Sequence, residues 1–321
     1  RGFPATDMMF TASVGSMRSG SAQFPVGRLP IVNDSSGINY LEKARVWDIK
    51  NRFDWMRKAT FAGGGASAGE QGAIMRGILN IRRAYGGSQV FGDTSCYFQR
   101  QGNTPITDFD SCLLEQAGLR YHFGHSSKNL FDVPIFEPGD YDDFDKPAFV
   151  WVNGLHGGDF TGTDSMAGER WLKAPNRGSV AWMGNSGAGY LSPLKIYGEI
   201  FMPLFADYMV EQPIGDVMLR TVNTFSDSVP GILTRNHTRQ MVLLGDPSFI
   251  LSRRRYALGI PDITLSSALI YPNPSKTFIY IESDNTSITE ASLLATDGRQ
   301  IAAAKPDGEH LRVDVRDLSA G

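Results

Sequence analysis

The residue with the clearest setting for chemistry is His125, which lies just after the apolar segment Leu119–Phe123. We predict this segment to be a strand of a parallel sheet, and catalytic groups gather at the carboxyl ends of such strands. Gly157-Gly158-Asp159-Phe160 closes the next buried strand, predicted over 147–153, and should lie near His125. A histidine at one strand end and a nucleophile at the next would allow attack on an amide carbonyl.

A second pattern is the glycine-rich segment 63–69, between a predicted strand and a predicted helix. Such a loop can cradle a phosphate with its backbone N–H groups. However, no Gly-Lys-Ser/Thr follows, Ala68 stands where the dinucleotide pattern has its last glycine, and Asp93 is only loosely placed as the required acid. The sequence therefore favours a flexible turn over a nucleotide site.

Two further patterns could carry chemistry. Residues 184–188, with Ser186 at their centre, approximate the nucleophile elbow of a hydrolase, and His237 would have to complete the triad. The acidic loop containing Asp140, Asp142 and Asp143 could hold a structural calcium ion, because carboxylate oxygens at alternating positions suit that ion. The favoured interpretation is a solvated acidic loop, and no other cofactor is expected.

The elements that must position these residues alternate between strands and helices. Periodicity predicts strands at 58–62, 89–92, 119–123, 147–153 and 178–183, and helices at 70–85, 108–117, 166–173 and 191–208. This alternation predicts an α/β fold with a parallel, doubly wound sheet covered on both faces.

The composition changes after Tyr256. Residues 258–267 are predicted to be a linker, and 268–321 a small antiparallel β-sandwich module with strands at 278–281, 291–295 and 311–315. Asp297-Gly298 and Asp307-Gly308 supply turns between these strands. The predicted domains are therefore 1–257 and 268–321.

Composition excludes several classes of protein. The 321 residues carry a net charge of −3 and no basic run longer than Arg253–Arg255, which argues against nucleic-acid binding. No apolar run approaches the roughly 20 residues that span a bilayer, so no transmembrane segment is expected. The two cysteines cannot form a disulfide scaffold or a four-thiolate zinc site. Because the chain opens at Arg1 without an apolar leader, we expect it to be an internal fragment.

Five segments, in the same order, are similar to the gingipain family of caspase-like cysteine peptidases. They resemble the family's "xGRxPv" segment, its "GHGS" histidine motif, its nucleophile strand ending before Gly-Asp-Phe, the helix and strand that follow, and its closing "LLGDP". In this chain they are residues 24–30, 121–127, 146–160, 168–181 and 243–247.

The resemblance implies a caspase-like sandwich with a partial amino-terminal sub-domain, and it implies roles for single residues. His125 would be the general base and the backbone N–H of Ser126 would help to bind the oxyanion. Asn185, Ser186 and Asp159 would form the wall of the substrate cleft. Ser126 itself replaces the second glycine of "GHGS".

The module at 268–321 resembles the C-terminal sorting domain of type IX secretion substrates. The similarity lies in residues 271–275, 297–299 and 313–321. It implies contact with the type IX secretion machinery and a secreted or cell-surface location in a Gram-negative, Bacteroidetes-type bacterium. The module looks incomplete, because the family's domain continues for one or two more strands.

The chain departs from the gingipain pattern at the nucleophile. Aligned on Gly158-Asp159-Phe160, the nucleophilic cysteine falls on Leu155, and aligned on Pro147 it falls on Gly154. Neighbouring choices give His156, Gly157 or Gly158, and both cysteines precede His125. A leucine side chain cannot attack an amide carbonyl.

Three functions follow from these observations. The favoured hypothesis is a secreted gingipain-like pseudopeptidase that retains a cleft for a peptide or protein ligand. The first alternative is an active endopeptidase with an unrecognised nucleophile. The second is a structural or adhesive cell-surface protein.

Overall fold

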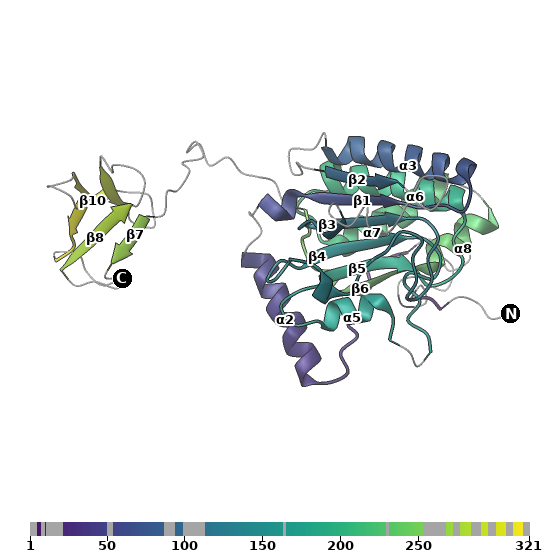
Figure 1. Ribbon diagram of the computed structural model, residues 1–321, viewed down its shortest axis with the longest axis horizontal. Helices are drawn as coiled ribbons and strands as arrows, with labels where there is room; N and C mark the ends of the chain where they lie inside the picture. The colour runs from purple at the N-terminus through teal and green to yellow at the C-terminus, as the bar shows by residue number, and fades with distance from the viewer. Residues whose placement is uncertain are drawn as a thin grey trace. The chain divides into compact units, whose positions relative to one another are not determined.

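A computed structural model describes residues 5–7, 10, 22–49, 54–86, 94–98, 113–162, 165–228, 231–252, 268–271, 277–283, 290–294, 300–305 and 311–316. The chain divides into two compact units, Arg1–Arg255 and Tyr256–Gly321. Each unit has its own sheets (Figure 1).

The larger unit is built on a six-stranded sheet. Its strand order is β2 (Thr94–Phe98), β1 (Ala59–Gly63), β3 (Leu119–Phe123), β4 (Ala148–Asn153), β5 (Ser179–Asn185) and β6 (Met241–Gly245). The first five strands are parallel, and β6 pairs antiparallel with β5. This confirms the predicted α/β fold, with one antiparallel edge strand added.

The pairing of β3 with β4 confirms the expected neighbourhood of the two strands that precede the candidate site. Their register runs from Leu119 opposite Phe149 to Phe123 opposite Asn153, so both strands end at the same level. Every residue of these two strands is buried. Burial on both faces explains why β4 is apolar up to Asn153, and why the Arg120 and His122 side chains of β3 lie beside the carboxylates of Asp143 and Asp132.

Helices cover both faces of this sheet (Figure 1). Helices α3 (Ala68–Gly86), α6 (Leu191–Pro203) and α7 (Ile214–Ser228) share one hydrophobic core, which includes Ile78, Phe201 and Phe225. Helix α5 (Ala167–Lys173) packs into a second core around Trp171 and Trp182. Helix α2 (Asp34–Ile49) contributes Tyr40 to that second core, and α8 (Ile232–Gln240) leads into β6.

Several elements differ from the sequence-based expectation. Helix α2 was not predicted, because its apolar residues do not form one stripe: Tyr40 and Trp47 are buried, whereas Ile38 and Leu41 are exposed. The helix predicted over 191–208 ends at Pro203 and continues as a π-helical turn, Leu204–Tyr208. The strand predicted at 89–92 and the helix predicted at 108–117 lie wholly or mostly outside the described residues; the nearest described strand is β2.

The smaller unit consists of antiparallel strands in two small sheets. One has the order β11 (Leu311–Asp314), β8 (Phe278–Ser283), β7 (Ala268–Tyr271), and the other pairs β9 (Ala291–Leu294) with β10 (Gln300–Ala304). The alternation predicted near residue 311 is present, since Leu311 and Val313 are buried and Arg312 and Asp314 are exposed. Strands β7 and β10 were not predicted.

We expect the larger unit to fold without the smaller one, because each unit buries its own apolar residues. A chain shortened to residue 258 should unfold in one cooperative step at the same urea concentration as the full chain. Tryptophan fluorescence follows this unit alone, since all five tryptophans lie before residue 256. A broad, non-cooperative transition in the shortened chain would contradict the domain boundary.

Candidate functional site

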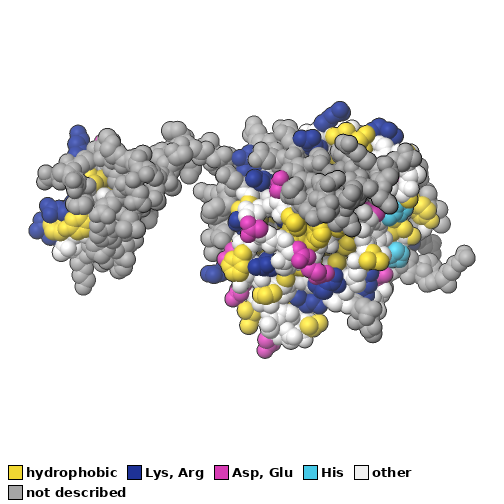
Figure 2. All heavy atoms as spheres, in the orientation of Figure 1, with side chains coloured by type: hydrophobic (Ala, Val, Ile, Leu, Met, Phe, Trp, Pro, Cys, Tyr) yellow, Lys and Arg dark blue, Asp and Glu magenta, His cyan; other side chains and the backbone are white. Residues whose placement is uncertain are grey.

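The loops that follow β3 and β4 meet at the carboxyl edge of the sheet. The Ser126 hydroxyl, in the loop after β3, donates a 2.6 Å hydrogen bond to the Leu155 carbonyl, in the loop after β4. His125 and Leu155 are therefore in neighbouring segments, as the sequence predicted. The side chains of His125 and His156 are 47% and 45% exposed. Figure 2 shows histidine side chains close to acidic ones on one face of the larger unit.

The imidazole of His125 is paired with a carboxylate. Its Nε2 lies 3.0 Å from Oε2 of Glu70, in the first turn of α3. Oε2 also accepts the Ala66 N–H at 2.8 Å, and the Glu70 N–H donates to the Ser67 hydroxyl at the helix start. Partial burial raises the pKa of Glu70, but the hydrogen bonds from His125 and Ala66 outweigh it, so the pKa is below its ordinary value.

Sequence reasoning missed Glu70. A carboxylate beside a catalytic histidine orients the ring and stabilises its protonated form. The available signal was Ser67-Ala68-Gly69-Glu70, the Ser-x-x-Glu pattern that begins helices, but it predicts a helix start and not a partner for His125.

Hydrogen bonds hold the backbone of the loop after β4 on both sides of Leu155. The Asn185 side-chain amide donates to the Gly154 carbonyl at 3.0 Å, the Trp182 indole N–H to the Gly157 carbonyl at 2.7 Å, and the His156 N–H to the Gly187 carbonyl at 2.9 Å. These bonds fix the backbone and leave the Leu155 side chain partly exposed.

Residues 154–158 were the candidate positions for the nucleophile, and the space around each one shows which of them can carry a side chain. A Cβ atom on Gly154 would lie 2.2 Å from Ser126 Oγ, one on Gly157 would lie 2.4 Å from Val152 Cγ1, and one on Gly158 would lie 2.4 Å from the Gly184 carbonyl oxygen. Leu155 and His156 are the two positions of this loop segment that already carry side chains. His156 has a left-handed backbone (φ 52°), and its Nδ1 lies 3.4 Å from Asp159 Oδ2.

Ser126 sits at the start of a short hairpin with Phe131. The hydrogen bonds of this bridge run from Ser127 N–H to Leu130 O (2.7 Å) and from Asp132 N–H to His125 O (3.0 Å). The N–H of Ser126 takes no part in either bond. The oxyanion role that the family resemblance implies for this N–H remains a prediction.

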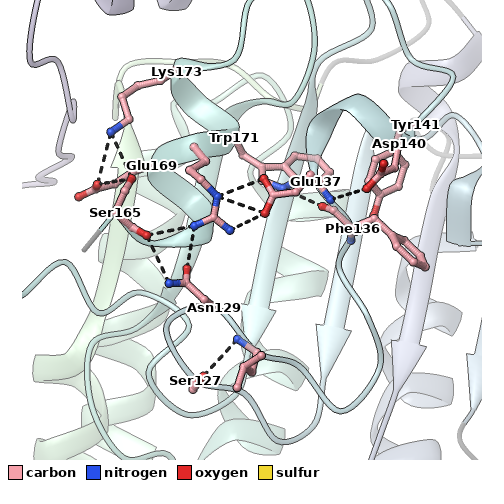
Figure 3. Close-up of polar contacts among 12 residues, drawn as sticks. Ser127, Asn129, Phe136, Glu137, Asp140, Tyr141, Ser165, Glu169, Trp171 and Lys173 are labelled. Atoms are coloured by element: carbon pink, nitrogen blue, oxygen red, sulfur yellow. Dashed lines mark hydrogen bonds and ion pairs between the residues drawn. The ribbon is translucent and has the colours of Figure 1, made fainter.

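The hairpin is fastened to α5 by a polar network (Figure 3). The Arg170 guanidinium donates to Asn129 Oδ1 at 3.0 Å and to the Glu137 carboxylate, with an Nη2–Oε1 distance of 2.5 Å. Lys173 extends the network to Glu169, 3.5 Å away. This network anchors the outer end of the segment that carries His125 and Ser126.

The predicted cleft wall needs correction. Asn185 and Ser186 are 0% and 3% exposed, so they support the loop from inside and offer no side chain to a ligand. The Ser186 hydroxyl donates to the Ala5 carbonyl. Of the three proposed wall residues, only Asp159 is partly exposed, and its carboxylate faces His156.

The nucleophile-elbow interpretation fails in the structure. His237, which would have to activate Ser186, is 3% exposed and packs against the rings of Tyr197 and Phe225, with centroids 5.1 and 5.4 Å away. Among the described residues, neither ring nitrogen has a hydrogen-bond partner. The Ser186 N–H is bound to the Gln240 carbonyl at 2.8 Å.

The glycine loop does not present an open phosphate cradle. The Gly65 N–H donates to Oδ2 of Asp132 at 2.8 Å, so an internal carboxylate occupies the place of an anion. A Cβ on Gly64 would lie 2.0 Å from the same oxygen. Gly64 is thus required by the close approach of Asp132, and this internal carboxylate gives a physical reason for the favoured interpretation of the segment as a turn.

The acidic loop does not assemble a calcium site. Asp143 is buried, with Oδ2 3.8 Å from Arg120 Nη2, and Asp140 accepts the Glu137 N–H. Burial raises the pKa of Asp143 to about 6 despite Arg120. Within the described residues, no group of three or more His, Cys, Asp or Glu side chains could hold a metal ion.

The fold and the site together define a class: an α/β domain with a histidine at the carboxyl edge of a parallel sheet, oriented by a carboxylate and set beside the loop of the next strand. Residues 2–252 match the model of peptidase family C25, and the chain belongs to that family of gingipain-type cysteine peptidases. Residues 269–321 match the secretion system C-terminal sorting domain. This domain indicates type IX secretion and a secreted or cell-surface location in Bacteroidetes.

Solved structures agree with this fold. A structure described as "Structure of Protease" has a TM-score of 0.67 at 13% identity, covering 97% of this chain and 72% of the other. The Arg-specific cysteine proteinase gingipain R (RGPB) gives 0.65 at 14% identity, with coverage of 98% and 74%. The complex of Porphyromonas gingivalis RgpB pro- and mature domains gives 0.64 at 12%, with coverage of 98% and 75%. At these identities the likeness is one of fold.

The comparison with curated proteins found no match. Among the described residues, no helix is both long and apolar enough to cross a membrane.

Proposed function

We propose that this protein is a secreted pseudopeptidase: a C25 domain that has lost the thiol nucleophile and binds a peptide segment at the surface formed by His125 and Leu155. The observation that carries the proposal is the absence of any cysteine after His125 in the sequence, with Leu155 in the nucleophile position. A thioester intermediate needs a thiolate next to the histidine, and this loop has none to offer.

The thiol of Cys96 does not replace it. Cys96 pairs with Phe61 in the middle of β2, at the far edge of the sheet, and β1 separates β2 from β3. Cys112 lies outside the described residues. The hydroxyl of Ser126, the residue after His125, donates its hydrogen bond to the Leu155 carbonyl.

Several features of the site suit peptide binding without cleavage. The Ser126 N–H lies outside the hairpin bonds, the His125 ring is half exposed, and Leu155 is partly exposed in the loop whose carbonyl accepts the Ser126 hydroxyl. A backbone donor next to an apolar side chain is a combination that can hold an extended peptide.

The test is a binding measurement. Random heptapeptides selected on the full chain should bind it in fluorescence polarisation, and Leu155→Arg should weaken binding at least tenfold, because a charged side chain replaces the apolar contact. Leu41→Arg, on the exposed side of α2, is the matched control and should bind normally. If selection yields no peptide that depends on Leu155, the structural or adhesive function becomes the better account.

A further inference from the structure

The loop after β3 folds back so that Asp132 lies over the ends of two strands. The hairpin closed by Ser126 and Phe131 turns the chain, and the Asp132 N–H donates to the His125 carbonyl at 3.0 Å. The Asp132 side chain is 16% exposed, so its carboxylate is largely withdrawn from water. A carboxylate in such a place must be satisfied by donors from the protein.

Asp132 is satisfied by four donors. Oδ2 accepts the backbone N–H groups of Gly65 and His125, both at 2.8 Å. Oδ1 accepts the Val133 N–H at 2.9 Å and lies 3.0 Å from Nε2 of His122, which is buried. Burial raises the pKa of Asp132, but the hydrogen bonds and the neighbouring His122 outweigh it, so the pKa is below its ordinary value.

The glycines around this carboxylate make the contact possible. Cβ atoms built on Gly64 and Gly124 would lie 2.0 and 2.4 Å from carboxylate oxygens of Asp132. Gly65 has a φ of +130°, a backbone conformation that side chains rarely allow. The loops after β1 and β3 are therefore shaped around Asp132.

A second carboxylate joins the same two loops one residue further on. Glu70 accepts the N–H of Ala66, which follows Gly65, and it also pairs with the ring of His125. Asp132 thus binds the backbone N–H groups of Gly65 and His125. Glu70 binds the backbone N–H of Ala66 and contacts the imidazole of His125. The geometry of the imidazole–Glu70 pair depends on the backbone that Asp132 holds.

We propose that Asp132, supported by His122, is the positioning residue of the His125–Glu70 pair. It acts through the backbone of both loops and contacts no ligand. This inference deepens the proposed function and rests on His125 and Glu70 being part of that site.

The pKa of Glu70 distinguishes a positioning role of Asp132 from a purely electrostatic one, because the two roles change that pKa in opposite directions. The negative charge of Asp132 raises the pKa of Glu70, whereas the bonds from His125 and Ala66 lower it. If Asp132 acts only as a neighbouring charge, Asp132→Asn will lower the pKa of Glu70 further. If Asp132 positions the loops, the same change will raise that pKa, since Glu70 loses its aligned donors.

The experiment is a pH titration of the full chain by NMR, with carbon-13 in the glutamate carboxyl groups and Glu70 assigned through Glu70→Gln. Asp132→Asn should raise the pKa of Glu70. Gly64→Ala should also raise it while keeping the charge of Asp132, because the added methyl displaces the carboxylate. Gly69→Ala is the matched control: apart from adjacent residues and the backbone of its own helix, no described atom lies within 4 Å of its added Cβ, and the pKa of Glu70 should not change.

His122→Gln provides a milder perturbation if either variant does not fold, with the same direction expected. A lowered or unchanged pKa of Glu70 in folded Asp132→Asn, Gly64→Ala or His122→Gln protein overturns the proposal. Since the measurement uses the protein without peptide, failure of peptide binding would leave this result unaffected, and the two proposals can fail separately.

Discussion

Replacing Leu155 with cysteine is expected to create a thiol that reacts with a peptide-based electrophile such as a chloromethyl ketone. The new thiol would stand in the loop that Ser126 joins to the His125 segment, next to an imidazole already paired with Glu70. Activation by that imidazole should make labelling roughly 10²-fold faster than in the Leu155→Cys, His125→Ala double variant. Mass spectrometry after digestion separates this adduct from any on Cys96 or Cys112.

Gly154→Cys is the matched control, because it tests the other alignment in the same loop. Its Cβ would lie 2.2 Å from Ser126 Oγ and 2.6 Å from the Gly124 carbonyl oxygen, so we expect a destabilised loop and no histidine-dependent labelling. The assignment of Leu155 fails if the Leu155→Cys thiol reacts equally fast with and without His125.

The stability of the larger unit should fall in acid because of His237. Burial lowers the pKa of His237 from 6.5 to about 3, so between these values the unfolded chain binds a proton that the folded chain does not. The contribution of neutral His237 to the free energy of unfolding is therefore complete above pH 6.5 and is lost as the pH falls toward 3. Replacing it with leucine should leave stability at pH 7 within about 1 kcal/mol and raise it at pH 4 by roughly 3 kcal/mol relative to the unmodified protein.

Urea unfolding followed by tryptophan fluorescence at pH 4 to 8 measures this difference. Asp143 should affect stability with the opposite pH dependence. Its pKa is raised from 3.8 to about 6, so its contribution to the free energy of unfolding is present below pH 3.8 and is lost as the pH rises through 6. Asp143→Asn should therefore cost more stability at pH 4 than at pH 7. If the free energy of unfolding depends on pH in the same way in the His237→Leu and unmodified proteins, His237 is not the group that destabilises the fold in acid.

The strands of the site were predictable because of their burial. Strands β3, β4 and β5 are buried along their whole length, and burial on both faces leaves them rich in apolar residues, most continuously in β4, which local sequence reveals. The same signal placed His125 and the 154–158 loop at the same sheet edge. Helix α2 carried no such signal, because its apolar residues are divided between core and solvent.

The carboxylates of the site were not predictable from local sequence. Glu70 is 55 residues before His125, and Asp132 is 67 residues after Gly65; only the parallel crossovers bring them together. The burial of Asn185, Ser186 and His237 also depends on neighbours from other elements. Motif similarity therefore proposed the histidine and the nucleophile position, whereas the carboxylates that contact this segment are identified only in the folded chain.

The measurement that tests the central claim most directly is a cleavage assay on the unmodified full chain. The protein is incubated at pH 7 with a peptide mixture that presents every residue type at the scissile position, and products are identified by mass spectrometry. We predict no cleavage above the buffer blank and no electrophile adduct on residues 154–158. Cleavage that disappears in His125→Ala would contradict the claim that this C25 domain lacks peptidase chemistry, and cleavage that survives it but disappears in Ser186→Ala would contradict the choice of His125 as well.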